Sequence, residues 1–178
     1  MAKSAVKSAP SPEPIDAISL LKADHRVVDD LFEQFDKARR SDTKARLVGQ
    51  ICNELKIHTI IEEEIFYPAV RPKIDADIVD EGVVEHDGAK VLINDLLAAK
   101  PTDQYYDAKV KVLSEEIRHH VQEEEKWLRG MFAQARRTEI DMDVLGAELA
   151  TRKAELKALA DAGKLPDAKL TSVKVMKG

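Results

Sequence analysis

The sequence has one cysteine and no long apolar run, and each shortage excludes a class of protein. Cys52 alone cannot form an intrachain disulfide framework or a cysteine-rich zinc site, which favours a reducing compartment. No stretch approaches the roughly 18 apolar residues of a membrane span, and the first residues lack the apolar core of a signal peptide. We therefore expect a cytoplasmic protein with no membrane partner.

Basic charge and aromatic residues are also scarce. The chain has 28 Lys and Arg against 33 Asp and Glu, a formal charge of −5, and aromatics make up 4% of its residues. It therefore lacks the basic footprint that binds nucleic acid, and we expect no nucleic-acid partner. What remains is 178 residues with 34% charged side chains and only seven Gly and seven Pro, which suits one compact, helix-rich domain.

Apolar residues recur at spacings of three and four in five segments, which predicts an all-α fold. Pro68 and Pro72 are expected to stop the second of these segments, and the third is expected to end before Pro101. A Ser-, Ala- and Pro-rich stretch at 1–14 is expected to be a flexible arm, and 164–178 a mobile tail. The predicted helices cover about 15–39, 43–67, 75–99, 103–135 and 140–162.

The chain contains an internal duplication with an offset of about 62 residues. Each half is a pair of helices with a histidine on one helix and a His-x-x-x-Glu pair on the next. Two such hairpins predict an up-down-up-down four-helix bundle, to which the segment 136–163 adds a fifth helix. The matching residues are His25, His58 and Glu62 in the first half, and His86, His120 and Glu124 in the second.

These six residues lie on the apolar stripes, so all of them should point into the bundle. Residues four apart project from the same side of a helix, which holds for both His-x-x-x-Glu pairs. Burying such groups without partners would cost several kcal/mol for each ionised side chain. A metal pair would satisfy them, with Glu62 and Glu124 spanning both ions and the histidines supplying nitrogen. Nitrogen and oxygen donors suit iron or manganese, and zinc can also bind to them. The alternative is a metal-free core in which the histidines form hydrogen bonds with the glutamates.

The residues around this set resemble the hemerythrin-like, or HHE cation-binding, domain family over about 15–135. The motifs that carry the resemblance are DHR at 24–26, HTIIEEEIFYP at 58–68, EHD at 85–87 and HHVQEEE at 119–125. The resemblance implies two iron ions with a bridging oxo or hydroxo group. It assigns His25, His58, His86 and His120 as ligands and Glu62 and Glu124 as bridges, with a site for dioxygen, peroxide or nitric oxide.

One departure from the oxygen-carrying members changes the expected function. They have a second histidine four residues after the one equivalent to His86, where this chain has Lys90. The second half also ends in His-x-x-x-Glu rather than a longer His-to-Asp spacing. With fewer histidine ligands, the metal has an open coordination position that water, a carboxylate or a tyrosinate can occupy. An open position on a redox metal favours reaction with peroxide or nitric oxide, or sensing of them, over storage of oxygen. The alternative is a regulatory or structural metal protein that signals to a protein partner through its C-terminal helix or tail.

Several neighbouring residues have two possible roles. Glu63 and Glu125 are expected at the seams of the bundle, either as partners of the ligands or as solvated charges. Lys90 is either a residue on the helix face or an ammonium group near the metal pocket. We expect Trp127 and Phe66 to close the bundle beyond the metal site. The remaining expectations are a core position for Tyr106, a solvent-facing His119 and a buried, inert Cys52.

Overall fold

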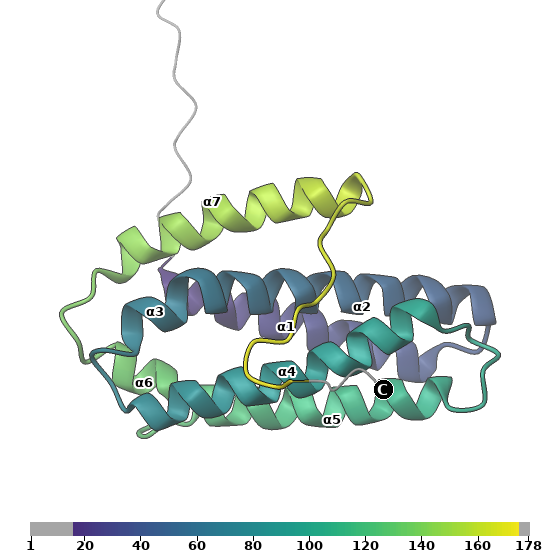
Figure 1. The fold of residues 1–178 in the computed structure, drawn as a ribbon, viewed down its shortest axis with the longest axis horizontal. Helices are drawn as coiled ribbons and strands as arrows, with labels where there is room; N and C mark the ends of the chain where they lie inside the picture. Colours follow the sequence, from purple (N-terminus) through teal and green to yellow (C-terminus); the bar gives the residue numbers. More distant parts are fainter. Residues whose placement is uncertain (1–15, 175–178) are drawn as a thin grey trace, which may run out of the picture.

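The computed structural model describes residues 16–174, whose body is a four-helix bundle (Figure 1). The first hairpin pairs α1 (Ala17–Lys37) with α2 (Ser41–Ile61). The second hairpin pairs α4 (Ala76–Ala98) with α5 (Tyr106–Glu125). The predicted all-α bundle of two helical hairpins is therefore confirmed. The expected flexible arm at 1–14 lies outside the described residues.

Aspartates fix the starts of two helices of the bundle. Asp16 accepts a hydrogen bond from the backbone N–H of Ser19 at 3.1 Å and begins α1. Asp75 accepts from the N–H of Asp77 at the start of α4. Such caps satisfy N–H groups that have no partner inside the helix. The observed bounds of α1 and α4 lie within about two residues of the predicted ones.

Pro68 does not end the second helix, contrary to the sequence-based expectation. α2 gives way to a π-helical segment, η1 (Glu62–Phe66), which is followed by α3 (Tyr67–Val70). The N–H of Tyr67 bonds to the carbonyl of Glu62, five residues earlier. Pro68 then falls in the first turn of α3, where its fixed φ suits a helical residue.

The predicted helix at 103–135 is wrong in its extent. α5 ends at Glu125, and a turn leads to the short helix α6 (Met131–Ala135). Lys126 has an extended ψ of 125°, which breaks the helix. Gly130 lies so close to the end of α5 that a Cβ there would be 2.5 Å from the carbonyl oxygen of Glu124.

The break in this helix also overturns the expected role of Trp127. Its side chain lies on the turn and is 85% exposed, so it does not close the bundle. Phe66, by contrast, is fully buried and contacts Phe132 of α6 edge to face, with ring centroids 5.6 Å apart. The aromatic closure beyond the centre of the bundle therefore comes from Phe66 and Phe132.

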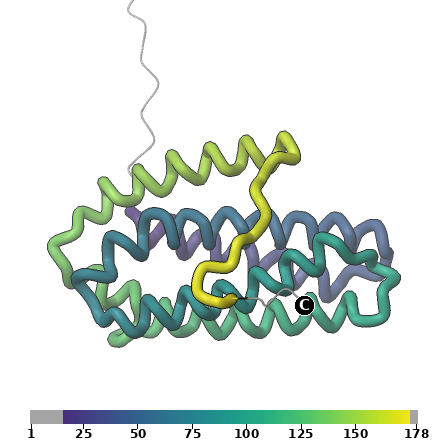
Figure 2. Tube along the Cα trace, in the orientation of Figure 1, coloured from purple at the N-terminus to yellow at the C-terminus, as the bar shows by residue number. Residues whose placement is uncertain are grey.

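The fifth helix, α7 (Met142–Asp161), packs across α1, α2 and η1 (Figure 2). Beyond it the chain crosses α2 and reaches α4, and we name residues 164–174 the C-terminal strap. The side-chain amide of Asn94 on α4 donates to the carbonyl of Ala168 at 2.8 Å. A mobile tail was expected here, but residues 171–173 of the strap bind Asp87, as described below. Residues 175–178 lie outside the described part.

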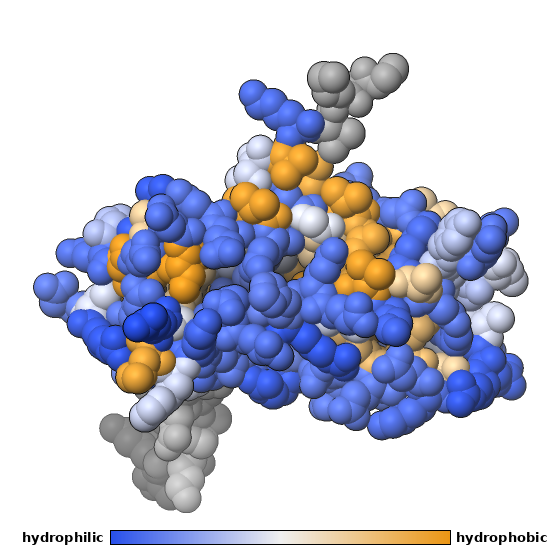
Figure 3. All heavy atoms as spheres, turned by 90° about the horizontal axis from the view of Figure 1, so that it is seen from below, coloured by the Kyte–Doolittle hydropathy of each residue, from blue (hydrophilic) through white to orange (hydrophobic). Residues whose placement is uncertain are grey.

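Two apolar clusters fill the bundle, with a polar layer between them. One cluster contains Leu21 of α1 and Ile61 of α2, and the other contains Val28 and Leu55 of the same helices. His25 falls between these positions on α1 and His58 between those on α2. Outside, hydrophilic residues cover most of the face in Figure 3, with apolar atoms in separate patches. None of the described helices combines the length and apolar character needed to cross a membrane.

Candidate metal centre

Four helices bring the six predicted residues into the polar layer, where each is 5% exposed or less. The Nε2 atoms of His25 and His58 are 3.2 Å apart, and those of His86 and His120 are 3.1 Å apart. Each hairpin thus presents two imidazole nitrogens at one point. The six residues are His25 on α1, His58 on α2, Glu62 in η1, His86 on α4, and His120 and Glu124 on α5.

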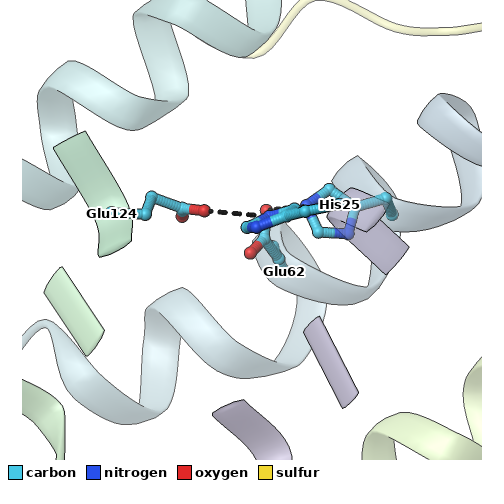
Figure 4. A group of neighbouring side chains, drawn as sticks. His25, Glu62 and Glu124 are labelled. Atoms are coloured by element: carbon cyan, nitrogen blue, oxygen red, sulfur yellow. Dashed lines mark hydrogen bonds and ion pairs between the residues drawn. The ribbon is translucent and has the colours of Figure 1, made fainter. Parts of the chain in front are cut away.

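The two glutamates connect the histidine pairs. Glu62 Oε2 lies 3.1 Å from Nε2 of His58 and 3.3 Å from Nε2 of His86. Glu124 Oε2 lies 3.3 Å from Nε2 of His25, an approach drawn in Figure 4, and 3.5 Å from Nε2 of His120. Each carboxylate therefore reaches one histidine of each hairpin, which is the arrangement expected of a bridging group.

Two predicted neighbours, Glu63 and Glu125, contact the outer nitrogens of the histidines. Glu125 Oε1 lies 2.8 Å from Nδ1 of His25, and Glu63 Oε1 lies 3.0 Å from Nδ1 of His86. A carboxylate at Nδ1 favours the tautomer with its proton on that atom, which leaves the Nε2 lone pair facing the cluster. These glutamates are therefore partners of the histidines rather than solvated charges.

Two further carboxylates, Asp24 and Glu85, serve the other histidines and were missed from the sequence. Glu85 Oε2 is 2.7 Å from Nδ1 of His120, and Asp24 Oδ2 is 3.7 Å from Nδ1 of His58. Each acid directly precedes a histidine, in the DHR and EHD motifs, but contacts a histidine of the neighbouring helix. Both acids could have been found from the sequence, because they occupy matching positions before His25 and His86 in the two halves.

Within residues 16–174, the cluster leaves buried polar atoms without hydrogen-bond partners. These are Nδ1 of His58, Oε1 of Glu62 and Oε2 of Glu124. Leaving such an atom unsatisfied costs about 1–3 kcal/mol. Two Nε2 lone pairs at 3.1–3.2 Å also repel each other unless a proton or a metal cation lies between them. The donor set therefore fits metal ions that accept nitrogen and oxygen ligands.

The charges in the cluster favour cations. Although burial alone would lower it, the carboxylates of Glu62 and Asp24 raise the pKa of His58 to about 10. Burial disfavours the ionised form of Glu62, but the imidazoles of His58 and His86 hold the pKa of that carboxyl well below its ordinary value. Without metal, His58 thus holds a proton beside the ionised Glu62, and metal binding has to displace this proton.

Tyr67 is a member of the cluster that helical periodicity did not predict. Its hydroxyl lies 3.2 Å from Oε1 of Glu124, 3.3 Å from Nε2 of His86 and 3.5 Å from Oε2 of Glu62. In an α-helix, residues five apart point about 140° away from each other. The π-helical bond between Tyr67 and Glu62 shifts that register and turns Tyr67 toward the centre.

Lys90 is the ammonium group near the pocket rather than a residue on the helix face. It is 3% exposed, and its Nζ donates to both oxygens of Glu63, at 2.7 and 2.9 Å, and to Asp87 at 3.2 Å. The strap completes this network, since Thr171 Oγ1 donates to Glu63 at 2.8 Å. Lys90 therefore fixes the carboxylate of Glu63, which in turn contacts Nδ1 of His86.

Asp87 anchors the strap and was missed from the sequence. The fully buried carboxylate accepts backbone hydrogen bonds from Thr171 at 2.8 Å, Ser172 at 2.6 Å and Val173 at 2.8 Å, and one from the Ser172 hydroxyl. Asp87 directly follows His86. The C-terminal strap is thus tied to the residue beside a predicted ligand.

The fifth helix supports the opposite side of the cluster. Lys153 of α7 forms an ion pair with Asp24, the acid that faces Nδ1 of His58. Of the other predicted residues, Tyr106 is in the core, Cys52 is buried and His119 is 63% exposed at its side chain, as expected. The cluster therefore receives support from both segments that follow the bundle.

A bundle with four imidazoles and two carboxylates converging in its interior belongs to the metal-binding helical bundles. Residues 16–132 match the model of the hemerythrin HHE cation binding domain, and the chain belongs to this family. The predicted family is thereby confirmed.

Two known proteins are similar to this chain. A crystal structure of a hemerythrin HHE cation binding domain-containing protein from Mycobacterium kansasii has a TM-score of 0.72 and 21% sequence identity, and the match covers 87% of this chain and 95% of that one. A protein from Nostoc sp. named DNA nickase is 26% identical over 125 residues. That match covers 70% of this chain but 36% of the relative, so the chain spans about a third of the Nostoc protein's length.

Proposed function

We propose that the cluster holds two iron ions with a bridging oxo or hydroxo group and binds, senses or reduces a small ligand. The candidate ligands are peroxide, nitric oxide and dioxygen. The observation that carries this proposal is the orientation of the histidines. Carboxylates lie within hydrogen-bond distance of three Nδ1 atoms, and Asp24 lies 3.7 Å from the fourth, so the Nε2 atoms and two carboxylates point at one buried volume. Manganese and zinc are the competing metals.

Each group of the chain has a defined task in this proposal. Glu62 and Glu124 hold the two ions together, because each reaches a histidine of both hairpins. Tyr67 adds a hydroxyl to the cluster as a seventh polar group. When bound, the iron pair supplies redox chemistry at an open coordination position. Phe66 and Phe132 exclude water on one side of the cluster.

The first experiment is elemental analysis of protein produced with ample iron, together with visible spectra before and after hydrogen peroxide or nitric oxide. We expect two irons per chain and a charge-transfer band that changes on addition of a ligand. Zinc, or a folded protein without metal, would contradict the proposal. The proposed setting is a reducing compartment such as the cytoplasm, consistent with one buried thiol.

A matched pair of variants assigns the effect to the cluster. His120→Ala removes a buried donor, whereas His119→Ala changes the adjacent, largely exposed side chain. We expect His120→Ala to lose metal and the spectral response while retaining helical circular dichroism, since both apolar clusters remain. His119→Ala should behave like the unchanged protein. Equal effects of both substitutions would argue against the assigned ligands.

A regulatory function is the second candidate, because both C-terminal segments reach the cluster. Lys153 of α7 pairs with Asp24, and the strap binds Asp87 beside His86. In this reading metal occupancy orders the strap, which then signals to a protein partner. Hydrogen exchange of residues 164–174 with and without metal tests it. Unchanged exchange on metal loading would leave the regulatory reading without support.

A further inference from the structure

A cavity of about 540 Å³ lies beside the metal centre, between α3 and α4. Glu63 and Tyr67 face it from the side of the cluster, and Thr171 and Ser172 of the strap contribute to its lining. Its remaining lining is mostly apolar and includes Pro68, Val79, Val83 and Val84. A site of this size and character suits small, weakly polar molecules.

Tyr67 separates this cavity from the cluster. It lines the cavity, yet it is 3% exposed and its hydroxyl contacts Glu124 and His86 in the cluster. The three polar contacts of the hydroxyl measure 3.2–3.5 Å, longer than a typical O–H···O hydrogen bond. These contacts are weaker than typical hydrogen bonds, and Tyr67 is the side chain whose rotation would open the cluster to the cavity.

Gly82 provides the space in which the Tyr67 hydroxyl lies. A Cβ at Gly82 would be 3.0 Å from that hydroxyl oxygen and 3.5 Å from Met131. Glycine inside a helix costs about 1 kcal/mol relative to alanine. At position 82 this cost is offset because a larger residue would crowd the Tyr67 hydroxyl. The Tyr67 hydroxyl thus occupies space that a side chain at Gly82 of α4 would fill.

Charges around the cavity are paired with one another. Arg71 forms a two-point ion pair with Asp80, at 2.8 and 2.7 Å, and Glu63 is bound by Lys90. A second groove, of about 230 Å³, reaches His25 between α1 and α5 and is lined by Arg26 and other charged residues. The cavity, with four apolar side chains, paired charges and more than twice the volume of the groove, therefore suits an uncharged molecule.

We propose that the cavity beside Tyr67 is the path by which a small uncharged ligand reaches the metal centre, with Tyr67 as its gate. This inference rests on the proposed function. Nitric oxide and dioxygen are ligands of this class. The strap forms part of the path, because Thr171 and Ser172 line it while Asp87 holds them in place.

Two variants with equal added bulk test the path. Val84→Trp fills the cavity from a side chain that is 53% exposed, and Gln122→Trp fills the groove between α1 and α5 from an exposed position. The iron-loaded proteins are mixed with nitric oxide and the association rate is followed by stopped-flow absorbance. We expect severalfold slower association for Val84→Trp, with unchanged metal content, and no change for Gln122→Trp. Equal rates in all three proteins, or slowing by Gln122→Trp alone, would overturn the proposal.

A second readout needs no metal. Crystals of the metal-free protein under xenon pressure should show xenon against Val79 and Val83, and Val84→Trp should abolish it. Absence of xenon from the cavity of the unchanged protein would also overturn the proposal. If the unchanged iron-loaded protein gives no response to nitric oxide, the proposed function fails instead. The xenon result then decides separately whether the cavity accepts small apolar molecules.

Discussion

Replacing Asp87 by asparagine should destabilise the protein markedly, although the two side chains have the same shape. The Asp87 carboxylate accepts hydrogen bonds from three backbone N–H groups of residues 171–173. Hydrogen bonds to a charged group contribute about 1.5–3 kcal/mol each, and neutral ones about 0.5–1.5 kcal/mol. Removing the charge changes each of the three bonds by about 1–1.5 kcal/mol, so it should lower the free energy of unfolding by about 3–4 kcal/mol, or the melting temperature by about 6–16 °C.

The assay for Asp87→Asn is urea denaturation of the metal-free protein, followed by far-ultraviolet circular dichroism. Asp80→Asn on the same helix is the control, since it breaks an exposed ion pair with Arg71 worth at most about 1 kcal/mol. Faster hydrogen exchange at residues 171–173 should accompany the loss. If Asp87→Asn remains within about 0.5 kcal/mol of the unchanged protein, or if these amides stay protected, the strap does not depend on this charge.

The same carboxylate makes this stability depend on pH. Although burial alone would raise it, the backbone N–H groups of residues 171–173 hold the pKa of Asp87 below its ordinary value. A carboxyl with a depressed folded-state pKa contributes fully above its unfolded pKa, near 3.9, and loses that contribution as the pH falls toward the folded pKa. The difference between Asp87→Asn and the unchanged protein should therefore be largest at neutral pH and shrink below about pH 4.

Three further predictions concern residues outside the cluster. Burial raises the pKa of Cys52 to about 12, so a thiol reagent at pH 8 should label it only after unfolding, and rapid labelling of the native protein would contradict its buried position. Trp127, the only tryptophan, is 85% exposed, so its fluorescence should be that of a solvated indole and iodide should quench it; a blue-shifted, protected emission would be incompatible with the observed turn. Gly130→Ala should cost more than about 2 kcal/mol because its Cβ would meet backbone atoms, whereas Gly49→Ala, with open space around it, should gain about 0.5–1 kcal/mol; similar effects of the two would refute the steric argument.

The regular part of the fold was predictable because it depends on local patterns. Apolar stripes and the duplication identified the helices of both hairpins, and the register of His58 with Glu62 and of His120 with Glu124 placed these side chains on inner faces. The structure brings these groups together, while their role as ligands stays a prediction. Glu63 and Glu125 were found for the same reason, since each follows a glutamate that faces the interior.

The remaining features depend on departures from the α-helical period or on contacts distant in the sequence. Tyr67 reaches the cluster through a π-helical turn, and Trp127 leaves the bundle because the chain turns after Glu125. A calculation based on 3.6 residues per turn misplaces both side chains. Asp87 binds residues 171–173, which lie 84 to 86 positions further along the chain. A single sequence carries no periodic signal for contacts at that separation.

The π-helical segment makes the two halves of the duplication unequal. Tyr67 has no counterpart in the second hairpin, because Arg129, 62 residues further on, lies exposed in the turn after α5. The hairpins are therefore not interchangeable building blocks. A protein assembled from two copies of the first hairpin would place two phenols at a symmetric centre, and one assembled from two copies of the second would have none. The π-helical register of one repeat therefore removes the twofold symmetry of the pocket, although the six inward-facing donors still follow it.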